Sequence, residues 1–243
     1  MRIGKQRPDL DVAFIAEPGG RPTGGIGSGE STVARFLVGK GAVHLDIDGL
    51  VHELEKPGQP VWKEIVASFG TDILAGDRSI DRDRLGELVF PNPAKRDLLN
   101  RIVHPAVYRA WKDRVRGIGD NREDAIVISD IPLLIEVGWV KDVDLVLLVH
   151  IPPDEQVRRV MKRNGISRRE ALERLHSQMP IDDKLRYADV VIHNEGTPAE
   201  TQRQIDLLWP RLVELERERR EAPGKPASPE MRTEEQKGGT GRE

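Results

Sequence analysis

Short runs of apolar residues alternate with longer segments of mixed polarity along most of the chain. The runs have the length of buried strands, and they lie at residues 12–16, 42–45, 125–129, 144–150 and 190–192. The segments between them are typical of helices, at residues 31–40, 153–163, 167–178 and 197–220. Because continuous apolar strands that alternate with helices are typical of a parallel sheet covered on both faces, the sequence predicts an α/β fold with five strands.

The region between the second and third expected strands has a different pattern. Residues 49–117 are almost wholly helical in pattern, with turn signals at Pro57-Gly58, at residues 75–77 and at residues 90–93. No alternation typical of a strand occurs there, so we expect a helical insertion. Beyond Ala222 the apolar periodicity ends, and the composition of residues 222–243 predicts a disordered tail.

A glycine-rich stretch at residues 23–32 (TGGIGSGEST) precedes the first expected helix. The spacing of Gly24, Gly29 and Ser31 matches the P-loop, in which backbone N–H groups bind phosphate oxygens at the N-terminus of a helix. Glycine suits this loop because it accepts a positive φ and lets a phosphate approach the backbone closely. The motif requires a lysine before the serine, and this chain has Glu30 instead.

The segment that leads into this loop is also unusual. Residues 17–22 (EPGGRP) contain two prolines and two glycines, whereas a strand normally leads directly into a P-loop. Two interpretations stay open at this point: either the first strand is displaced, or the approach to the loop is remodelled. Residues 1–22 are therefore treated as an atypical N-terminal segment that contains the first strand.

Composition narrows the class of protein. The net charge is −3, so no basic field indicates nucleic acid or an anionic membrane as a partner. The absence of cysteine excludes thiolate metal sites, and the six histidines lack metal-ligand spacing, so no zinc site is expected. No apolar run approaches the roughly 18 residues of a membrane span, and the charged N-terminus lacks the apolar core of a secretory signal. Together these features predict a cytoplasmic protein.

Several motifs occur in order along the chain: the P-loop stretch at 23–34, Asp46-x-Asp48, Val103-His-Pro105, Pro132-Leu-Leu-x-Glu136, Gln156-x-x-Arg159-x-x-x-Arg163 and Ala188-Asp-x-Val-Ile-x-Asn194-x-Gly196. Together, over residues 23–209, they resemble the dephospho-CoA kinase family. The resemblance implies a P-loop nucleoside-triphosphate hydrolase-like fold. Its core would comprise residues 12–48 and 125–221, with an acceptor-binding helical insertion at about 49–117 and a lid at about 155–180.

The activity that the resemblance implies is ATP-dependent phosphorylation of the ribose 3′-hydroxyl of dephospho-CoA, the last step of coenzyme A synthesis, with Mg²⁺ as the metal. The implied nucleotide-binding residues are Gly25, Ile26, Gly27, Ser28, Gly29, Glu30, Ser31 and Thr32. The Ser31 hydroxyl would bind Mg²⁺. Asn194 would approach the adenine ring, and its alternative role is that of a turn residue.

The implied catalytic residues are Asp48, Arg159 and Arg163. Asp48 stands where the family places its general base, and its alternative role is the N-cap of a helix at 49–55. Asp46 is assigned a structural or metal-water role. Arg159 and Arg163 lie four residues apart on one helix face, so both can face one anion, although a solvated basic face would look the same. Arg174 and Gln178 are further lid candidates.

The implied acceptor pocket consists of Asp48, His104, Pro132, Leu133, Leu134 and Glu136. Core packing is the alternative role of Leu133 and Leu134. The implied ligands are thus ATP, Mg²⁺ and a small-molecule acceptor.

Glu30 brings the activity of this chain into question. Loss of a cation about 4 Å from a phosphate charge costs up to about 4 kcal/mol at an effective dielectric constant near 20. Since about 1.4 kcal/mol corresponds to tenfold in rate, we expect strongly reduced ATP affinity and turnover unless another cation replaces the lysine. By their spacing, neither Arg21 nor Arg35 is well placed to do so. The local fold should survive, because glutamate is a good helix former at a helix start that is expected to face solvent.

Two other functions stay open at the level of sequence. One is a catalytically weak or inactive member of the family that binds dephospho-CoA or CoA, which Glu30 and residues 17–22 favour. The other is a different small-molecule P-loop kinase, such as a nucleoside monophosphate kinase. Asp46-x-Asp48 and His104-Pro105 argue against that second alternative.

Overall fold

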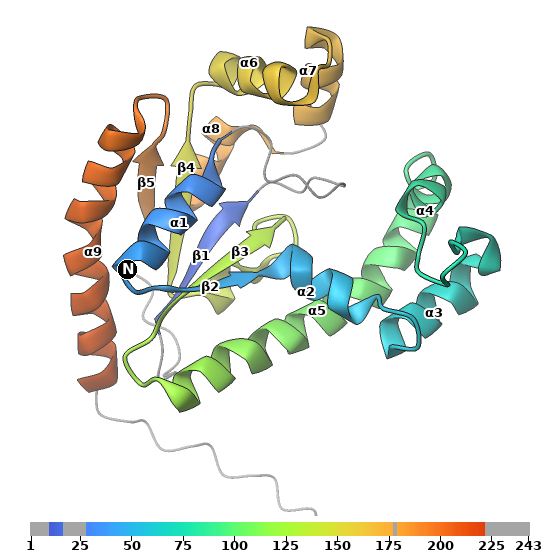
Figure 1. Ribbon diagram of the computed structural model, residues 1–243, viewed down its shortest axis with the longest axis horizontal. Helices are drawn as coiled ribbons and strands as arrows, with labels where there is room; N and C mark the ends of the chain where they lie inside the picture. The colour runs from blue at the N-terminus through green and yellow to red at the C-terminus, as the bar shows by residue number, and fades with distance from the viewer. Residues whose placement is uncertain (1–9, 17–27, 177–178, 222–243) are drawn as a thin grey trace, which may run out of the picture.

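A sheet of five parallel strands forms the centre of the molecule (Figure 1). This computed structural model describes residues 10–16, 28–176 and 179–221. The strands are β1 (Leu10–Ala16), β2 (Val43–Asp46), β3 (Ile126–Pro132), β4 (Leu145–His150) and β5 (Val190–His193), in the spatial order β2-β3-β1-β4-β5. The predicted α/β class with five parallel strands is confirmed.

The first strand occupies the middle of this sheet. β1 pairs with β3 from Leu10 opposite Ile126 to Ala16 opposite Pro132, and it also pairs with β4 on its other side. The strand is therefore not displaced, and that interpretation of the N-terminal segment was wrong. Residues 17–22 lie outside the described residues, as do Gly25, Ile26, Gly27 and the segment 222–243.

Helices cover both faces of the sheet (Figure 1). One face packs against α1 (Glu30–Lys40) and α9 (Pro198–Glu221), and the other against α2 (Ile47–Leu54) and α5 (Pro93–Asn121). Side chains alternate between the two cores: Ile126 and Ile128 belong to the first, whereas Val127 belongs to the second. Among the described helices, none is long and apolar enough to cross a membrane.

The helical insertion has a small core of its own. It consists of α3 (Pro60–Phe69), a 3₁₀ turn (Thr71–Ile73), α4 (Arg82–Val89) and the N-terminal half of α5. Its buried side chains are Val61, Ile65, Ile73, Leu85 and Val89. The predicted turn signals coincide with breaks between these elements. The expected boundary at residue 117, however, falls inside α5, whose C-terminal half covers the sheet.

The segment expected to act as a lid follows β4. It consists of α6 (Pro153–Asn164) and α7 (Arg168–His176), which pack on each other through Val157, Val160 and Ala171. A short helix, α8 (Ile181–Lys184), and a 3₁₀ turn (Leu185–Tyr187) lead the chain to β5, and a further 3₁₀ turn (Trp139–Asp142) precedes β4. The α6–α7 segment and the insertion project on either side of the C-terminal ends of the strands (Figure 1).

A buried polar network fixes α5 against the sheet. Asp11 is fully buried in β1, and its carboxylate accepts a hydrogen bond from Ser129 Oγ (3.2 Å) and pairs with Lys112 Nζ (3.5 Å). Ser129 Oγ in turn accepts a hydrogen bond from Trp111 Nε1 (2.9 Å). Because buried polar groups are costly when unpaired, this network favours one position of α5 on the sheet.

The central core should dominate the stability of the fold. Leu147 is fully buried in β4, whereas the side chain of Leu207 on α9 is 81% exposed. We expect Leu147→Ala to lower the free energy of unfolding by about 2–5 kcal/mol, because it leaves a cavity. The matched change Leu207→Ala should alter it by less than about 0.5 kcal/mol. Urea denaturation of both variants tests this, and equal effects would contradict the packing described here.

Candidate active site

The end of the glycine-rich loop is held against the turn that follows β5. Gly29, immediately before α1, has φ +90°, and a Cβ atom built there would lie 2.2 Å from Asn194 Nδ2. Only glycine therefore fits this position. Asn194 Nδ2 donates to the carbonyl of Ser28 (2.6 Å), and Asn194 Oδ1 accepts from Thr201 Oγ1 (2.7 Å). The Asn194 side chain thus connects the loop with β5 and α9, and its contact with adenine stays a prediction.

Glu30 begins α1 and is buried, with 4% of its surface exposed. The expectation that this helix start faces solvent was therefore wrong, because the sheet edge and neighbouring segments enclose it. Ser28 Oγ donates a hydrogen bond to Glu30 Oε1 (2.5 Å). Burial raises the pKa of the Glu30 carboxyl, while the hydrogen bond from Ser28 and the charges of Lys184 and Arg163 act in the opposite direction.

A second carboxyl group, that of the half-buried Asp130, lies near the C-terminal end of β3. Burial, followed by the charges of Glu30, Asp48 and Asp46, raises the pKa of Asp130 to about 7. Among the described residues, no donor reaches its buried Oδ1 atom. Sequence reasoning missed Asp130. The signal was present in residues 125–130 (AIVISD), an apolar strand that ends in a carboxylate.

Asp46 and Asp48 have separate local roles. Asp46 is the N-cap of α2, and its Oδ1 atom accepts a hydrogen bond from the backbone N–H of Gly49 (2.9 Å). The proposed capping role of Asp48 was therefore wrong, because the helix begins two residues earlier than expected. Asp48 lies in the first turn of α2 and is accessible to solvent. Partial burial raises the pKa of Asp48, and the neighbouring charge of Asp46 adds to the rise.

The two lid arginines approach the loop from α6. Arg159 Nε donates to Glu155 (2.8 Å), and its Nη2 donates to the carbonyl of Asn194 (2.8 Å). Arg163 is exposed, and its charge acts on the Glu30 carboxylate. Both side chains therefore lie toward the end of the loop, in agreement with their shared helix face. Their catalytic roles stay predictions.

The remaining cation candidates differ in position. Arg35 is exposed, and its guanidinium lies over the ring of Phe36 (5.7 Å), so it is directed along α1 rather than to the loop. Arg21, Gln178 and the side chain of Arg174 lie outside the described residues. Lys184, which sequence reasoning missed, is only 1% exposed. Because α8 has only four residues, no helical periodicity could indicate which of its side chains are buried.

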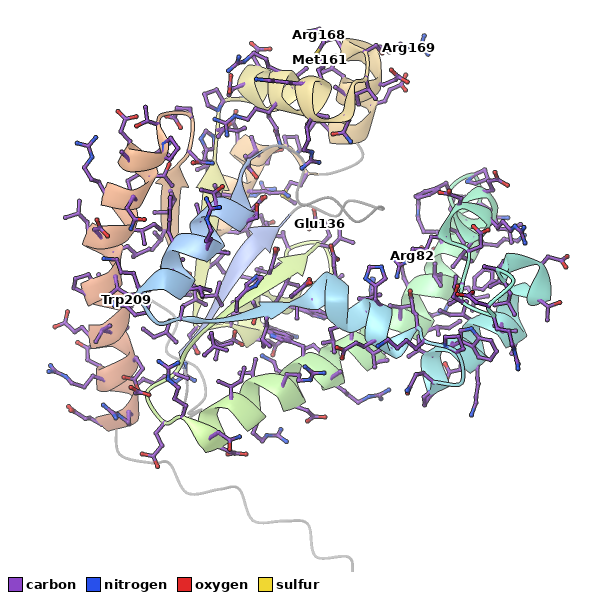
Figure 2. All side chains as sticks on the ribbon, in the orientation of Figure 1. Arg82, Glu136, Met161, Arg168, Arg169 and Trp209 are labelled. Carbon is purple, nitrogen blue, oxygen red and sulfur yellow. The ribbon has the colours of Figure 1, made fainter. Side chains whose placement is uncertain are left out.

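The acceptor candidates follow β3 and lie along α5. Leu133 has φ +63°, an unusual backbone conformation that is common at functional sites. Leu134 is fully buried in the core, which confirms its alternative role, and Glu136 is exposed. In Figure 2, Glu136 lies on the side of the sheet edge that faces the insertion, from which Arg82 projects. Nothing is described of the Pro132 side chain.

His104 lies in α5, where its ring contacts that of Trp139 edge to face (6.3 Å between centroids). Burial lowers the pKa of His104, which favours the neutral ring. The following proline, Pro105, lies inside α5 without ending the helix. The structure thus gives His104 a packing contact, and its contact with an acceptor stays a prediction.

A glycine-rich sequence that follows the central strand of a parallel sheet and ends at the start of α1 is typical of the P-loop kinase fold. The family model for dephospho-CoA kinase matches residues 22–200. The dephospho-CoA kinase of Syntrophus aciditrophicus is 52% identical over 82% of this chain and 85% of its own length. The dephospho-CoA kinase of Geobacter metallireducens is 45% identical over 79% of this chain and 95% of its own length. The chain belongs to the dephospho-CoA kinase family.

Solved structures show the same fold. The crystal structure of TT1252 from Thermus thermophilus has a TM-score of 0.68 and 32% identity, over 84% of this chain and 98% of that one. The structure of the dephospho-CoA kinase from Campylobacter jejuni has a TM-score of 0.55 and 22% identity, over 85% of this chain and 98% of that one. The second likeness supports the fold alone.

The raised pKa of Asp130 predicts how stability depends on pH. A carboxyl group whose folded pKa lies near 7, against about 4 when unfolded, stabilises the fold below pH 4, and this contribution is lost as the pH rises to 7. In EDTA, the free energy of unfolding should therefore fall between pH 5 and pH 8 in the native chain and change less in Asp130→Asn. The exposed Asp97→Asn is the control. Identical pH profiles for Asp130→Asn and the native chain would contradict the assigned burial of this charge.

Proposed function

We propose that this protein transfers the γ-phosphoryl group of ATP to the ribose 3′-hydroxyl of dephospho-CoA and so forms coenzyme A. The observation that carries this proposal is the family match over residues 22–200, which contains every motif implied in the site. The relatives cited above bear the name of that enzyme. The cytoplasm, where ATP is available, is the location that goes with this activity.

Asp48 is the proposed general base. It lies beside the end of β2, is accessible to an acceptor, and has a raised pKa that makes it a better proton acceptor than an ordinary aspartate. From this position its carboxylate would accept the proton of the 3′-hydroxyl and orient the oxygen toward the phosphorus. Phosphoryl transfer depends mainly on such positioning and on charge neutralisation.

Ser31 and Asp130 are the proposed residues for Mg²⁺. Both offer oxygen atoms, which this ion prefers, and few protein ligands are needed where phosphates supply the others. The buried Oδ1 atom of Asp130, which no described donor reaches, fits this role. When bound, Mg²⁺ would neutralise charge on the β- and γ-phosphates. Arg163 is the proposed lid cation for the transferred group, and the Arg159–Asn194 contact would hold the lid near the loop.

A second candidate function is binding of dephospho-CoA or CoA without turnover. The buried carboxylate of Glu30 favours it, because a negative charge at the start of α1 opposes the phosphates that a P-loop binds. A coupled ATP-consumption assay with dephospho-CoA decides between the two functions. Adenosine and AMP serve as comparison acceptors, and calorimetric titration of dephospho-CoA measures binding alone.

The role of Asp48 is tested by two matched substitutions. We expect Asp48→Asn to lower kcat by about a hundredfold or more, because it removes the proton acceptor. Asp46→Asn should have a much smaller effect, since asparagine caps helices as well as aspartate does. Steady-state kinetics of both variants with dephospho-CoA give the comparison. A larger loss in Asp46→Asn than in Asp48→Asn would reverse the two assignments.

A further inference from the structure

Lys184 is an unusual residue because its charge is buried. Its side chain is 1% exposed, and its Nζ atom is out of reach of solvent. Lysine is almost never fully buried unless an anion lies close to it. The helix that carries it, α8, is held at the C-terminal end of β4 by the contact of Asp182 with His150 Nε2 (2.9 Å). The fold therefore keeps this cation at the sheet edge.

The carboxylate of Glu30 is an anion on which this charge acts. The positive charge of Lys184, and to a smaller extent that of Arg163, acts to lower the pKa of the Glu30 carboxyl against the effect of burial. The two residues come from elements far apart in sequence, and both side chains are almost fully buried. Two opposite charges that share a water-excluded region interact more strongly than they would at the surface. A buried positive charge therefore acts on residue 30, although residue 30 itself is a glutamate.

The other described cations near the loop are less suitable. Arg35 lies over the ring of Phe36, and Arg159 already donates to the carbonyl of Asn194. Arg163 is exposed on a segment that projects from the core. Lys184 combines burial, a fixed element and attraction to the start of α1. It therefore satisfies the physical requirements of a phosphate-binding cation that residue 30 cannot meet.

We propose that Lys184 supplies the positive charge to the ATP phosphates that the P-loop of this chain lacks at residue 30. The charge of Lys184 attracts the Glu30 carboxylate, and a bound triphosphate would offer it a second anion in the same region. The inference rests on the proposed use of ATP. It also explains how a chain with glutamate at this position could retain a working site.

The test is a set of four proteins: the native chain, Lys184→Met, Glu30→Lys, and the double variant. In the native background, Lys184→Met should lower kcat/KM for ATP by about a hundredfold, as expected for loss of a charge that stabilises the transition state. It should also weaken binding of inorganic tripolyphosphate, measured by calorimetry, by about tenfold or more. In the Glu30→Lys background, Lys184→Met should lower kcat/KM for ATP by less than about threefold, because the restored lysine supplies the positive charge.

A matched control is Lys40→Met, at the far end of α1, where Lys40 pairs with Asp206 (2.7 Å) at the surface. It should leave both measurements unchanged. Thermal unfolding verifies that Lys184→Met is folded, and Lys184→Gln provides a second variant with a polar end. Equal losses from Lys184→Met in both backgrounds, or no loss in the native one, would overturn the proposal.

The tripolyphosphate measurement needs no acceptor, so it tests the role of Lys184 separately from the proposed kinase function. Binding that depends on Lys184, without phosphorylation of dephospho-CoA, would overturn the proposed function and support the role of Lys184. Phosphorylation of dephospho-CoA that persists unchanged in Lys184→Met would support the proposed function and overturn the role of Lys184.

Discussion

The enclosure of a carboxyl group at the start of α1 is the constraint on which the site depends. A helix N-terminus favours negative charge, and Glu30 occupies the place where a P-loop helix meets phosphates. Ser28 donates to its carboxylate, Lys184 attracts it, and Asp130 is affected by its charge. Because Glu30 and Lys184 are both almost fully buried, their attraction is stronger than it would be at the surface. Glu30 therefore interacts with several of the polar and charged groups at this sheet edge.

The same region connects the loop to the expected lid. Asn194 donates to the carbonyl of Ser28 and accepts a hydrogen bond from Arg159 at its own carbonyl. These two hydrogen bonds link the end of the loop to α6. Further along the chain, α8 carries the buried Lys184 and precedes β5. We therefore expect displacement of the α6–α7 segment to alter the contacts at the end of the loop.

The fold followed closely from the apolar pattern, since strand runs and turn signals are local features. The site motifs also placed Asp48, Arg159 and Arg163 at one edge. Local patterns could not show the burial of Glu30, because that depends on packing between distant segments. Local patterns also could not show that Asp46, and not Asp48, is the N-cap of α2, because that depends on whether the helix begins at residue 47 or at residue 49. The burial of Lys184 could not be predicted from the sequence, because a helix of four residues is too short to show a periodic pattern.

Titration of ATP into the native chain and into Glu30→Gln, followed by calorimetry, tests the central claim most directly. Glutamine has nearly the same shape as glutamate and can still accept the hydrogen bond from Ser28, so the change removes little except the charge. If the buried carboxylate opposes phosphate binding, Glu30→Gln should bind ATP about tenfold more tightly or better, a gain of at least ~1.4 kcal/mol. Equal or weaker binding by Glu30→Gln would contradict the account.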